Sequence, residues 1–554
     1  MSNTNSVQTD LLIIGAGPAG LSTAIHCADL CKKHGVQRRI LLIEKGSSVG
    51  SHILSGAVIR PDIFKELLPE HKIEDIPMES PVKKDKLMFL LNKSCAIPSP
   101  IHLPHMSNKG TYTASLGLVC QYLATIAEEK GVELYTGFAV NEVLYNSDGK
   151  ICGVKTIDTG INHHGEKMEN FQPGTTIEAK LTIFAEGTRG SLTKQIINKF
   201  HLDKGRNPQI YSLGCKEIWE VPDSTVKPGD VCHTMGYPLN LKEFGGGFIY
   251  GLSNNRVAVG LVIGLDYADP TFDIFNAFQI WKTHPAVASK LKGGKMIKFG
   301  AKTLPEGGFY SMPKPYTDNA LIVGDGAGFL AMPALKGIHL AIISGMLAAQ
   351  TALSAFAKED YSENSLKLYE EKIKASAIYK ETYPVRNFRQ GFAKGLIMGA
   401  FHFGTQLVSC GAGFFGRLNV HSDAAATKTV KKFSGKCFKD RFKDKLEFDK
   451  ELTFDKMTAL YNSGTRHDEN QICHLVINNS ETFDTVNIEQ YDAPCQYFCP
   501  AEVYEIHKDR DGNKKLRIHF ENCVHCKTCD IKEVADGITW NVPNGDNGPE
   551  YLNM

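Results

Sequence analysis

Residues 11–20 read LLIIGAGPAG, and this stretch decides the fold of the first part of the chain. Its four apolar residues have the length and composition of a buried strand. Three glycines follow, a helical pattern begins at about Leu21, and a second apolar run comes at Ile40–Ile43. Strand, glycine turn, helix and strand in this order predict a βαβ unit with parallel strands.

The glycine turn matches G-x-G-x-x-G, the pattern of dinucleotide-binding loops. Its glycines let the backbone approach a pyrophosphate at the start of the helix, where free N–H groups attract negative charge. Glu44 ends the second strand, placed to bind an adenosine ribose and to repel a 2′-phosphate, which disfavours NADP. A glycine turn without a ligand is the weaker alternative. The predicted dinucleotide-binding residues are Gly15, Gly17, Pro18, Ala19, Gly20 and Glu44.

A second, distant signature favours FAD over NAD. Residues 321–325 read LIVGD, and a helix is expected to start at about Lys336. An acid at the end of this strand can bind the ribityl chain of a flavin, while the helix points its positive end at the flavin ring. Gly-Asp after a strand is a common turn on its own, but paired with the first loop it resembles the glutathione-reductase class of flavoproteins. The predicted FAD-binding residues here are Gly324, Asp325 and Gly337.

Near the end of the chain, residues 523–529 read CVHCKTC. Three thiolates at this spacing are typical of a loop that binds a cubane 4Fe–4S cluster, whose fourth ligand in ferredoxins is a cysteine before a proline. The pair Cys499-Pro500 lies upstream, while Cys495 and Cys473 compete for this role without a following proline. A zinc site is the alternative for the whole segment. The predicted cluster ligands are Cys499, Cys523, Cys526 and Cys529.

Two hydroxyl groups are close to these cysteines in the sequence. Thr528 stands between two predicted ligands, and Tyr504 follows Cys499-Pro500. Hydrogen bonds from hydroxyl groups to cluster or cysteine sulfurs stabilise the more negative, reduced cluster and raise its reduction potential. Each residue therefore fits tuning of the potential, and each fits plain packing equally well.

Two apolar segments suggest contact with a membrane. Leu87–Pro104 has two short apolar stretches divided by Asn92-Lys93-Ser94, which predicts a hairpin, and Gly395–Gly416 contains no Lys, Arg, Asp or Glu. The second segment is long enough to span a bilayer, but it holds six glycines and several polar residues. An interfacial patch that dips into one leaflet is therefore expected, with a buried core helix as the alternative.

Composition narrows the classes of protein. The chain has 554 residues, enough for two or three domains, and 62 Lys+Arg against 61 Asp+Glu give no reason to expect nucleic acid as a partner. Five of its fifteen cysteines fall between Cys495 and Cys529, which fits reduced thiols at a metal site better than disulfides. Met1 to Asp10 has no signal or transit peptide pattern, so we expect a protein that stays on the side where it is made or is already processed.

The combination of motifs resembles the electron-transfer flavoprotein:ubiquinone oxidoreductase family over nearly the whole chain. The most discriminating motif is the Cys-Pro pair with the final cysteine loop. The stretches that carry the resemblance are Ile14–Gly20 with Ser22, 50–57, Ile183–Gly187, Phe244–Tyr250, Gly260–Pro270, Lys336–His339 and Cys499–Tyr504 with 523–529. Two positions depart from the family's pattern: Glu502 stands where the family has Gly, and Gly251 stands where it has His.

The resemblance implies a dehydrogenase in which reduced electron-transfer flavoprotein delivers electrons one at a time, and ubiquinone leaves as ubiquinol. The family's quinone site maps onto Gly245 and Gly246, whose backbone can approach a quinone carbonyl. Its membrane-contacting elements map onto the hairpin and the glycine-rich segment. No catalytic acid or base stands out, and a converter between one-electron and two-electron carriers needs none.

We therefore expect an α/β, multi-domain (α+β) architecture for a monomer. Its parts are a discontinuous glutathione-reductase-like FAD domain (1–85, 105–190, 300–370), a quinone and membrane-contact domain (86–104, 205–300, 371–425) and a ferredoxin-like 4Fe–4S domain (426–554). The expected location is the cytoplasmic face of a bacterial inner membrane, or alternatively the matrix face of the mitochondrial inner membrane. Rival interpretations are an FAD-dependent monooxygenase, the related flavoprotein of bifurcating systems with a ferredoxin module, and a zinc-stabilised, nucleotide-binding membrane scaffold.

Overall fold

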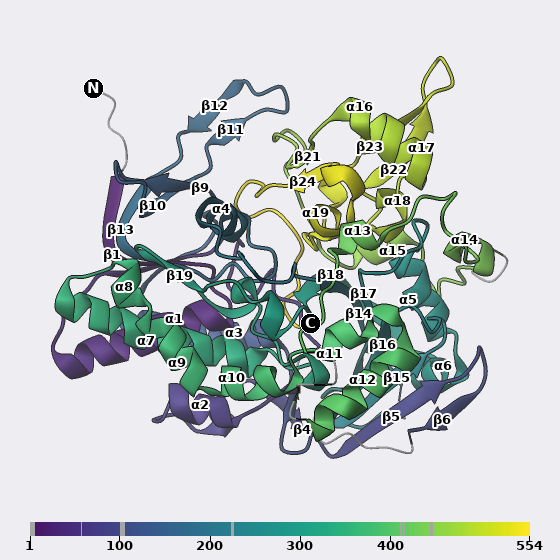
Figure 1. Cartoon of the computed structure of the whole chain (residues 1–554), viewed down its shortest axis with the longest axis horizontal. Helices are drawn as coiled ribbons and strands as arrows, with labels where there is room; N and C mark the ends of the chain where they lie inside the picture. The colour runs from purple at the N-terminus through teal and green to yellow at the C-terminus, as the bar shows by residue number, and fades with distance from the viewer. Residues whose placement is uncertain are drawn as a thin grey trace.

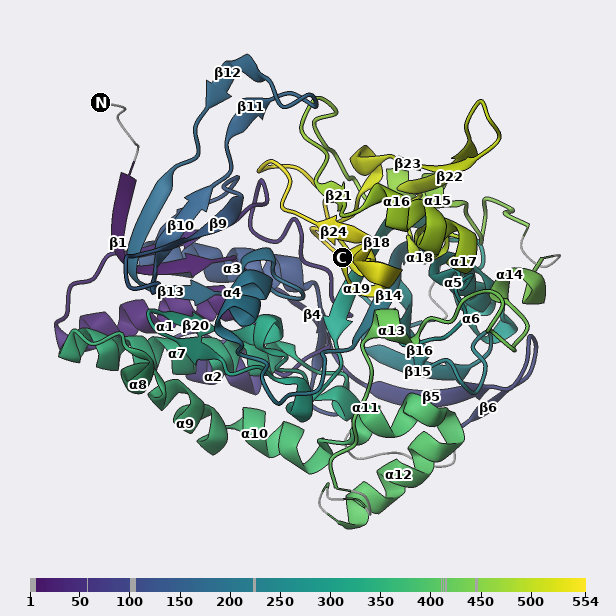
Figure 2. The same ribbon diagram turned by 45° about the horizontal axis from the view of Figure 1, so that its top comes forward.

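The computed structural model describes residues 6–56, 58–99, 106–222, 226–409, 411, 413, 416–443 and 447–554. Two large sheets stand side by side, and the C-terminal segment lies over one end of the second (Figure 1). Helices cover the outer face of the first sheet and the lower edge of the molecule (Figure 2).

The first sheet has the order β19-β20-β13-β1-β2-β8, with β10 beside β13 and β9 beside β10. β1 lies parallel to both β13 and β2, so the predicted βαβ unit is confirmed. Every residue of the run 11–14 is buried, as a central parallel strand requires. Its strands are β1 Ser6–Ile14, β2 Ile40–Ile43, β8 Glu133–Tyr135, β9 Val140–Tyr145, β10 Ile151–Thr156, β13 Thr176–Phe184, β19 Tyr316–Thr317 and β20 Ala320–Ile322.

Helices α1 (Pro18–His34) and α7 (Ile338–Lys358) pack along each other beneath this sheet (Figure 2). By length and composition α7 alone, among the described helices, could cross a membrane, but 67% of its apolar window is buried inside the protein, as expected of a core helix. Smaller elements complete this half: α2 Asp62–Leu67, α3 Leu116–Glu129, α4 Ser191–Phe200, β3 Val58–Ile59, β4 Met78–Pro81, β7 Tyr112–Ala114, β11 Thr159–Ile161 and β12 Lys167–Gln172.

The second sheet has the order β18-β14-β17-β16-β15-β5-β6. The predicted hairpin forms its outer edge as β5 and β6, and residues 100–104 of that hairpin lie outside the described residues. Helices α5 (Ile274–Lys282) and α6 (Pro285–Leu291) pack on this sheet. Its strands are β5 Lys84–Leu90, β6 Ala96–Pro98, β14 Tyr211–Glu220, β15 Asp230–Gly236, β16 Gly245–Gly251, β17 Arg256–Gly264 and β18 Lys295–Pro305.

A helical run follows α7 and ends in the glycine-rich segment. The predicted segment Gly395–Gly416 contains one helix, α12, and its residues 410, 412, 414 and 415, including Phe414 and Phe415, lie outside the described residues. The helices of this run are α8 Glu363–Leu366, α9 Leu368–Ala375, α10 Ala377–Thr382, α11 Phe388–Gly391 and α12 Leu396–Val408.

The C-terminal segment forms small hairpins and short helices around the cysteines. Asp530 in α19 pairs with Arg189 at 2.6 Å and Lys194 at 2.7 Å, which fastens this segment to the first sheet's domain. Its elements are α13 Asp423–Ala426, α14 Phe438–Arg441, α15 Lys456–Tyr461, β21 Leu475–Ile477, α16 Ser480–Thr482, α17 Glu489–Tyr491, α18 Cys495–Phe498, β22 Tyr504–Lys508, β23 Lys514–Ile518, α19 Thr528–Lys532 and β24 Ile538–Trp540.

The charge-rich run 428–450 has the composition of a linker, but its described residues include aromatic side chains that pack against the second sheet's domain. Phe438 and Phe442 are buried in the core that contains Phe272, because the charges of this run alternate with aromatic residues that a charge count overlooks.

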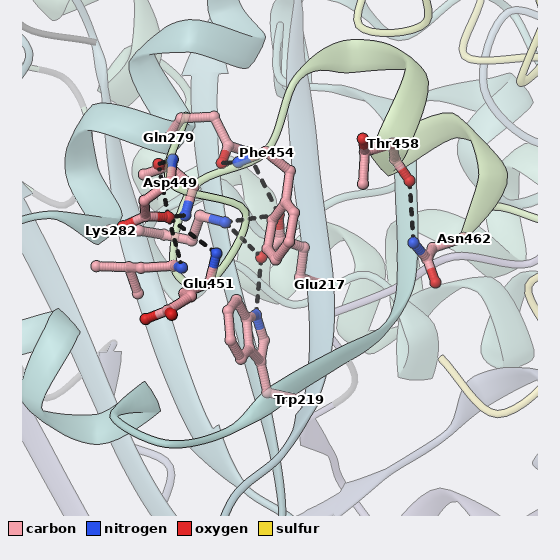
Figure 3. Close-up of polar contacts among 11 residues, drawn as sticks. Glu217, Trp219, Gln279, Lys282, Asp449, Glu451, Phe454, Thr458 and Asn462 are labelled. Atoms are coloured by element: carbon pink, nitrogen blue, oxygen red, sulfur yellow. Dashed lines mark hydrogen bonds and ion pairs between the residues drawn. The ribbon is translucent and has the colours of Figure 1, made fainter. Parts of the chain in front are cut away.

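A buried ion pair anchors the segment that follows. Lys282 Nζ contacts both carboxylate oxygens of Glu217 at 2.9 Å, with both side chains fully buried (Figure 3). Trp219 Nε1 donates to the same carboxylate at 2.7 Å. Gln279 Nε2 donates to it at 3.3 Å, and Gln279 Oε1 accepts from the backbone N–H of Phe454 at 3.0 Å. The network ties the start of the cysteine-bearing segment to β14 and α5.

Candidate functional site

One cavity of about 1120 Å³ lies between the two sheets and the C-terminal segment. The glycine loop, the strand end at 323–325 and the start of α7 line one part of it, and β16 lines another. Gly20 does not line it. The predicted residues that do are Gly15, Gly17, Pro18, Ala19, Glu44, Gly245, Gly246, Gly324, Asp325 and Gly337.

The glycine loop is shaped by close backbone approaches. Gly15 has φ 104°, and a Cβ there would lie 2.5 Å from the carbonyl oxygen of Ala185. A Cβ at Gly20 would lie 2.0 Å from the carbonyl oxygen of Gly15. Gly20 therefore allows helix α1 to pack closely against the loop, while Gly15 and Gly17 face the cavity.

Two helix N-termini meet at this part of the cavity. The caps of α1 and α7 are Gly17 and Gly337, and neither helix start has a capping hydrogen bond from a side chain. Free backbone N–H groups at helix starts bind anions. The arrangement fits the pyrophosphate of a dinucleotide at α1 and an electron-rich ring at α7.

Acidic side chains border the same region. Glu44 accepts hydrogen bonds from the backbone N–H groups of Ala16 and Gly46, both at 2.9 Å. Through Ala16 it fixes the backbone of the glycine loop. Burial raises the pKa of Asp325. A 3.2 Å hydrogen bond from Thr188 Oγ1 lowers this pKa, but by less than burial raises it. Glu186 also lines the cavity, and it accepts from the backbone of Thr193 at 2.7 Å at the start of α4. We did not predict Glu186 as a site residue, although the stretch Ile183–Gly187 contains it.

The β16 end of the cavity combines glycine with aromatic residues. A Cβ at Gly245 would lie 2.4 Å from Val262 O, and one at Gly246 would lie 2.5 Å from Thr234 O. These glycines are thus required by strand packing, and they also leave backbone exposed to the cavity. From here the cavity continues to apolar side chains of α11 and α12, namely Phe388, Phe392, Leu396, Ile397, Ala400, Phe403 and Leu407.

His233 and Tyr250 also line the cavity, and the sequence alone did not single them out. His233 Nε2 lies 2.9 Å from Tyr250 Oη, across neighbouring strands β15 and β16. Burial lowers the pKa of His233 to about 4 and raises the pKa of Tyr250. The pair is therefore neutral at physiological pH and extends the apolar character of this end.

The four predicted cluster ligands are all buried and influence one another electrostatically. Burial, with Cys526 nearby, raises the pKa of Cys499 to about 11 and that of Cys523 to about 12. Such thiols ionise only beside strong positive charge, which iron supplies. Four cysteine thiolates are the donor set of a cubane 4Fe–4S cluster.

The two competing cysteines point elsewhere. The thiol of Cys473 donates to Leu475 O at 3.3 Å. Cys495 lies beside the carboxyl group of Glu533, and burial raises the pKa of both groups, that of Glu533 to about 7. Cys495 is nevertheless close enough to Cys499 and Cys529 for their charges to add to the rise in its pKa.

One of the two predicted hydroxyl groups donates to a ligand sulfur: Thr528 Oγ1 bonds Cys526 Sγ at 3.3 Å. The hydroxyl group of Tyr504 has no hydrogen-bond partner among the described residues. It lies near Cys529, where it partly offsets the rise in the pKa of that thiol that burial causes.

Three lysines form the wall between the cavity and the cysteine loop, and they were not predicted because lysine usually lies at the surface. Lys45 Nζ lies 2.8 Å from His525 Nδ1. Lys302 Nζ donates to His525 O at 3.4 Å, and Lys527 Nζ donates to Arg189 O at 2.9 Å. Burial lowers the pKa of all three, that of Lys45 to about 7. An anionic group bound in the cavity or in the loop would favour the charged form of these lysines.

Comparison with known proteins agrees with this geometry. Family models match at residues 450–552 (electron transfer flavoprotein-ubiquinone oxidoreductase, 4Fe-4S), 211–304 (ETF-QO, ubiquinone-binding) and 13–69 (NAD(P)-binding Rossmann-like domain). The chain is 41% identical over 558 residues to the electron transfer flavoprotein-ubiquinone oxidoreductase of Pseudomonas aeruginosa, covering 99% of both chains. The chain belongs to the electron transfer flavoprotein-ubiquinone oxidoreductase family.

Mitochondrial members are equally similar. The Arabidopsis thaliana protein is 41% identical, with 99% of this chain and 85% of that protein covered, and the Homo sapiens protein is 39% identical, with 99% and 89% covered. The family matches confirm the predicted fold class and the three kinds of site, for FAD, a 4Fe–4S cluster and ubiquinone.

Among solved structures, a geranylgeranyl bacteriochlorophyll reductase-like protein of Thermoplasma acidophilum has a TM-score of 0.50 at 21% identity, over 67% of this chain and 84% of that one. This likeness concerns the fold alone.

Proposed function

We propose that the protein takes electrons from reduced electron-transfer flavoprotein and passes them through one 4Fe–4S cluster and one FAD to ubiquinone. The observation that carries this proposal is the single cavity bounded by the glycine loop, by β16 and by the wall of the cysteine loop. Such a cavity lets a flavin exchange electrons with a quinone on one side and a cluster on the other. Bound FAD supplies the ability to accept single electrons and to deliver a pair.

FAD is held by the dinucleotide elements of the first sheet. Gly15, Gly17, Pro18 and Ala19 bring backbone N–H groups to the pyrophosphate at the start of α1, and Gly20 keeps that helix close to the loop. Glu44 binds the adenosine ribose. Gly324 and Asp325 bind the ribityl chain, and Gly337 directs the start of α7 at the ring.

The cluster ligands in this proposal are Cys499, Cys523, Cys526 and Cys529. Their burial and mutual repulsion support iron as the charge that makes them thiolates. Thr528 raises the reduction potential through its hydrogen bond to a ligand sulfur, and Tyr504, which lies near Cys529, is assigned the same role.

Ubiquinone binds at Gly245 and Gly246, with its tail along the apolar side chains of α11 and α12. The outer side of α12 supports a membrane contact, since Ile397, Phe401 and Val408 are 70%, 56% and 89% exposed at helical spacing. Leu91 and Leu241 are also exposed, and the β5–β6 hairpin lies on the same side of the molecule as α12 (Figures 1 and 2). The protein therefore rests on one leaflet through residues of Leu87–Pro104 and Gly395–Gly416.

The proposal includes three further assignments, for the domain boundaries, the oligomeric state and the location. The domain boundaries are 1–85, 105–190 and 300–370 for FAD, 86–104, 205–300 and 371–425 for quinone, and 426–554 for the cluster. The protein acts as a monomer on the cytoplasmic face of a bacterial inner membrane, with the matrix face of a mitochondrial inner membrane as the alternative.

Purified protein tests the proposal directly. Iron and flavin analysis, followed by reduction with electron-transfer flavoprotein and ubiquinone, should give one FAD, about four irons per chain, and ubiquinol formation. Zinc in place of iron, or reduction that never reaches the quinone, would refute it.

A further inference from the structure

Three histidine side chains of the C-terminal segment meet at one point. His467 lies in the loop after α15, His474 directly precedes β21, and His525 lies in the cysteine loop. One ring nitrogen of each lies within 4.8 Å of the other two. His474 and His525 are buried, and His467 is half-buried. The group is therefore enclosed by the protein but reachable from solvent past His467.

His474 has ring nitrogens that the protein leaves without partners. Both nitrogens are buried, and neither has a hydrogen-bond partner among the described residues. The ring stacks on that of His467 at a centroid distance of 5.3 Å and meets Trp540 and Phe520 edge to face, at 5.8 Å and 6.1 Å. Buried polar atoms without partners are rare in native proteins, because leaving them unpaired costs free energy. The unpaired nitrogens indicate a ligand that the ring can bind.

The other two rings each direct one nitrogen at the other ring. His467 Nε2 lies 2.9 Å from His525 Nε2. The second nitrogen of each ring has a partner of its own: His467 Nδ1 donates to the carbonyl oxygen of Glu521 at 2.9 Å, and His525 Nδ1 lies 2.8 Å from Lys45 Nζ. Since Nδ1 of His467 holds the ring proton, its Nε2 keeps a lone pair. Contacts to the second nitrogen orient histidines that bind metal ions in the same way.

We propose that His467, His474 and His525 form a binding site for a divalent transition metal ion of the zinc class. Three imidazole nitrogens and one open position for water are a ligand set that zinc accepts. Zinc–nitrogen bonds of about 2.1 Å place two ligand nitrogens about 3.4 Å apart, so His467 and His525 would separate slightly and His474 would approach. This site goes beyond the proposed function and does not depend on which cysteines hold the cluster.

Two features oppose the ion and define what it must replace. Lys45 brings positive charge to the far nitrogen of His525. The 2.9 Å contact between the two Nε2 atoms is a hydrogen bond when no ion is bound. A bound ion exchanges this one hydrogen bond for three bonds, and it gives a nitrogen of His474 the partner that it lacks. Binding should therefore require all three histidines.

The test uses the purified full-length protein with its FAD and iron, dialysed against a chelator and then against zinc chloride. Elemental analysis measures zinc and iron together, and isothermal titration calorimetry measures the affinity for zinc. X-ray absorption at the zinc edge identifies the ligands, because zinc–nitrogen bonds are about 2.0–2.1 Å and zinc–sulfur bonds about 2.3 Å long.

His474→Phe is the decisive variant. It keeps an aromatic ring of similar shape, and it removes no hydrogen bond among the described residues. The control is the double variant His163→Ala/His164→Ala. These two histidines are exposed in the loop between β11 and β12, with ring centroids 3.9 Å apart, and form the surface pair most able to hold zinc adventitiously.

The parent protein and the control variant should bind about one zinc ion per chain, through nitrogen, with unchanged iron content. His474→Phe should bind zinc at least about 100-fold more weakly, since loss of an outer-shell partner alone costs about 10–100-fold. Equal affinity in His474→Phe, loss of zinc from the control variant, sulfur bound to the zinc, or release of iron by zinc would each overturn the inference.

Two further results keep the test decisive. If His474→Phe does not fold, the ligands seen by X-ray absorption in the parent protein and the zinc content of the control variant still decide. A protein that lacks iron but binds zinc through nitrogen alone would contradict the proposed function and leave the histidine site intact. A protein with iron and no such zinc would contradict only the histidine site.

Discussion

Thr303 Oγ1 donates a 2.7 Å hydrogen bond to the backbone carbonyl oxygen of Cys526. Thr303 belongs to β18, the edge strand of the second sheet, and Cys526 to the cysteine loop. The neighbouring Lys302 faces the cavity and bonds the next carbonyl of the loop, that of His525, at 3.4 Å. The edge strand of the second sheet thus holds the cysteine loop at the cavity wall.

Thr303→Val should therefore destabilise the protein and loosen the cluster. The change keeps the shape of a side chain that is 2% exposed, but leaves the carbonyl of Cys526 without its partner, at a cost of about 1–3 kcal/mol. Thermal unfolding and the rate of iron loss measure this. Thr125→Val is the control, because its exposed hydroxyl bonds only Gln121 O and its removal should change stability by less than about 0.5 kcal/mol. Equal melting temperatures for the two variants would contradict the expectation.

Single cysteine variants test the fourth ligand. Cys499→Ala should lose the cluster, whereas Cys495→Ala and Cys473→Ala should keep it, because those thiols are directed at Glu533 and at Leu475 O. Iron per FAD in the purified variants is the measurement. Equal iron contents for Cys499→Ala and Cys495→Ala would show that the assignment is wrong.

The buried pair Glu217–Lys282 offers a test of the anchor for the C-terminal segment. Lys282→Met leaves a buried carboxylate without its cation, and breaking such a pair costs about 3–5 kcal/mol. Adding Glu217→Gln should recover a large part of that loss, since no unpaired charge remains. Thermal melting of both variants measures the difference. A double variant no more stable than the single one would mean that packing, not charge, dominates here.

The exposed side of α12 should govern membrane binding. Ile397→Ser and Phe401→Ser each remove an apolar side chain that would be buried in lipid, worth about 1.5–3 kcal/mol, so vesicle binding should fall at least about tenfold for each. Val476→Ser is the matched control, because Val476 is exposed on β21 in the cysteine-bearing segment. Reduction of a water-soluble quinone should be unaffected. Unchanged vesicle binding by the α12 variants would place the contact elsewhere.

His233 should contribute to acid sensitivity. Its pKa is lowered to about 4 by burial, with Asp85 opposing and Lys336 adding to the shift. Above about pH 6.5 the native and unfolded states are both neutral at this residue. As the pH falls from about 6.5 to about 4, only the unfolded state binds the proton at this residue. The free energy of unfolding therefore falls by up to about 3 kcal/mol.

His233→Gln should remove this part of the pH dependence, so its melting temperature should approach or exceed that of the parent protein as the pH is lowered from 7 to 5. His467 carries a similar shift, to about 4, and leaves a residual slope. Tyr250→Phe is the control, because it breaks the same 2.9 Å hydrogen bond without removing the titrating group. Parallel pH curves for the parent protein and His233→Gln would contradict the assignment.

Local motifs predicted the fold class, and most of the residues that they single out line one cavity or lie in one buried core. The run 11–14 is buried in a parallel strand, the loop after it faces the cavity, and four cysteines from two distant stretches are buried in one core. These features were predictable because each motif is a short segment whose own residues determine its backbone geometry or ligand chemistry.

The wall between cavity and cluster was not predictable in the same way. Lys45, Lys302 and Trp540 come from three distant strands or strand ends, and only the tertiary fold brings them together. Lysine is usually a surface residue, and a lone tryptophan is usually core. The available signals were weak: Lys45 directly follows Glu44, and Lys527 lies within the cysteine loop.

The measurement that tests the central claim most directly is a reductive titration of the purified protein, followed by electron paramagnetic resonance and visible absorption, with ubiquinone added at the end. The account predicts one cluster signal and one flavin that are both reduced by electron-transfer flavoprotein and both reoxidised by ubiquinone. A flavin that is reoxidised by ubiquinone while the cluster signal persists would contradict electron transfer through the shared wall.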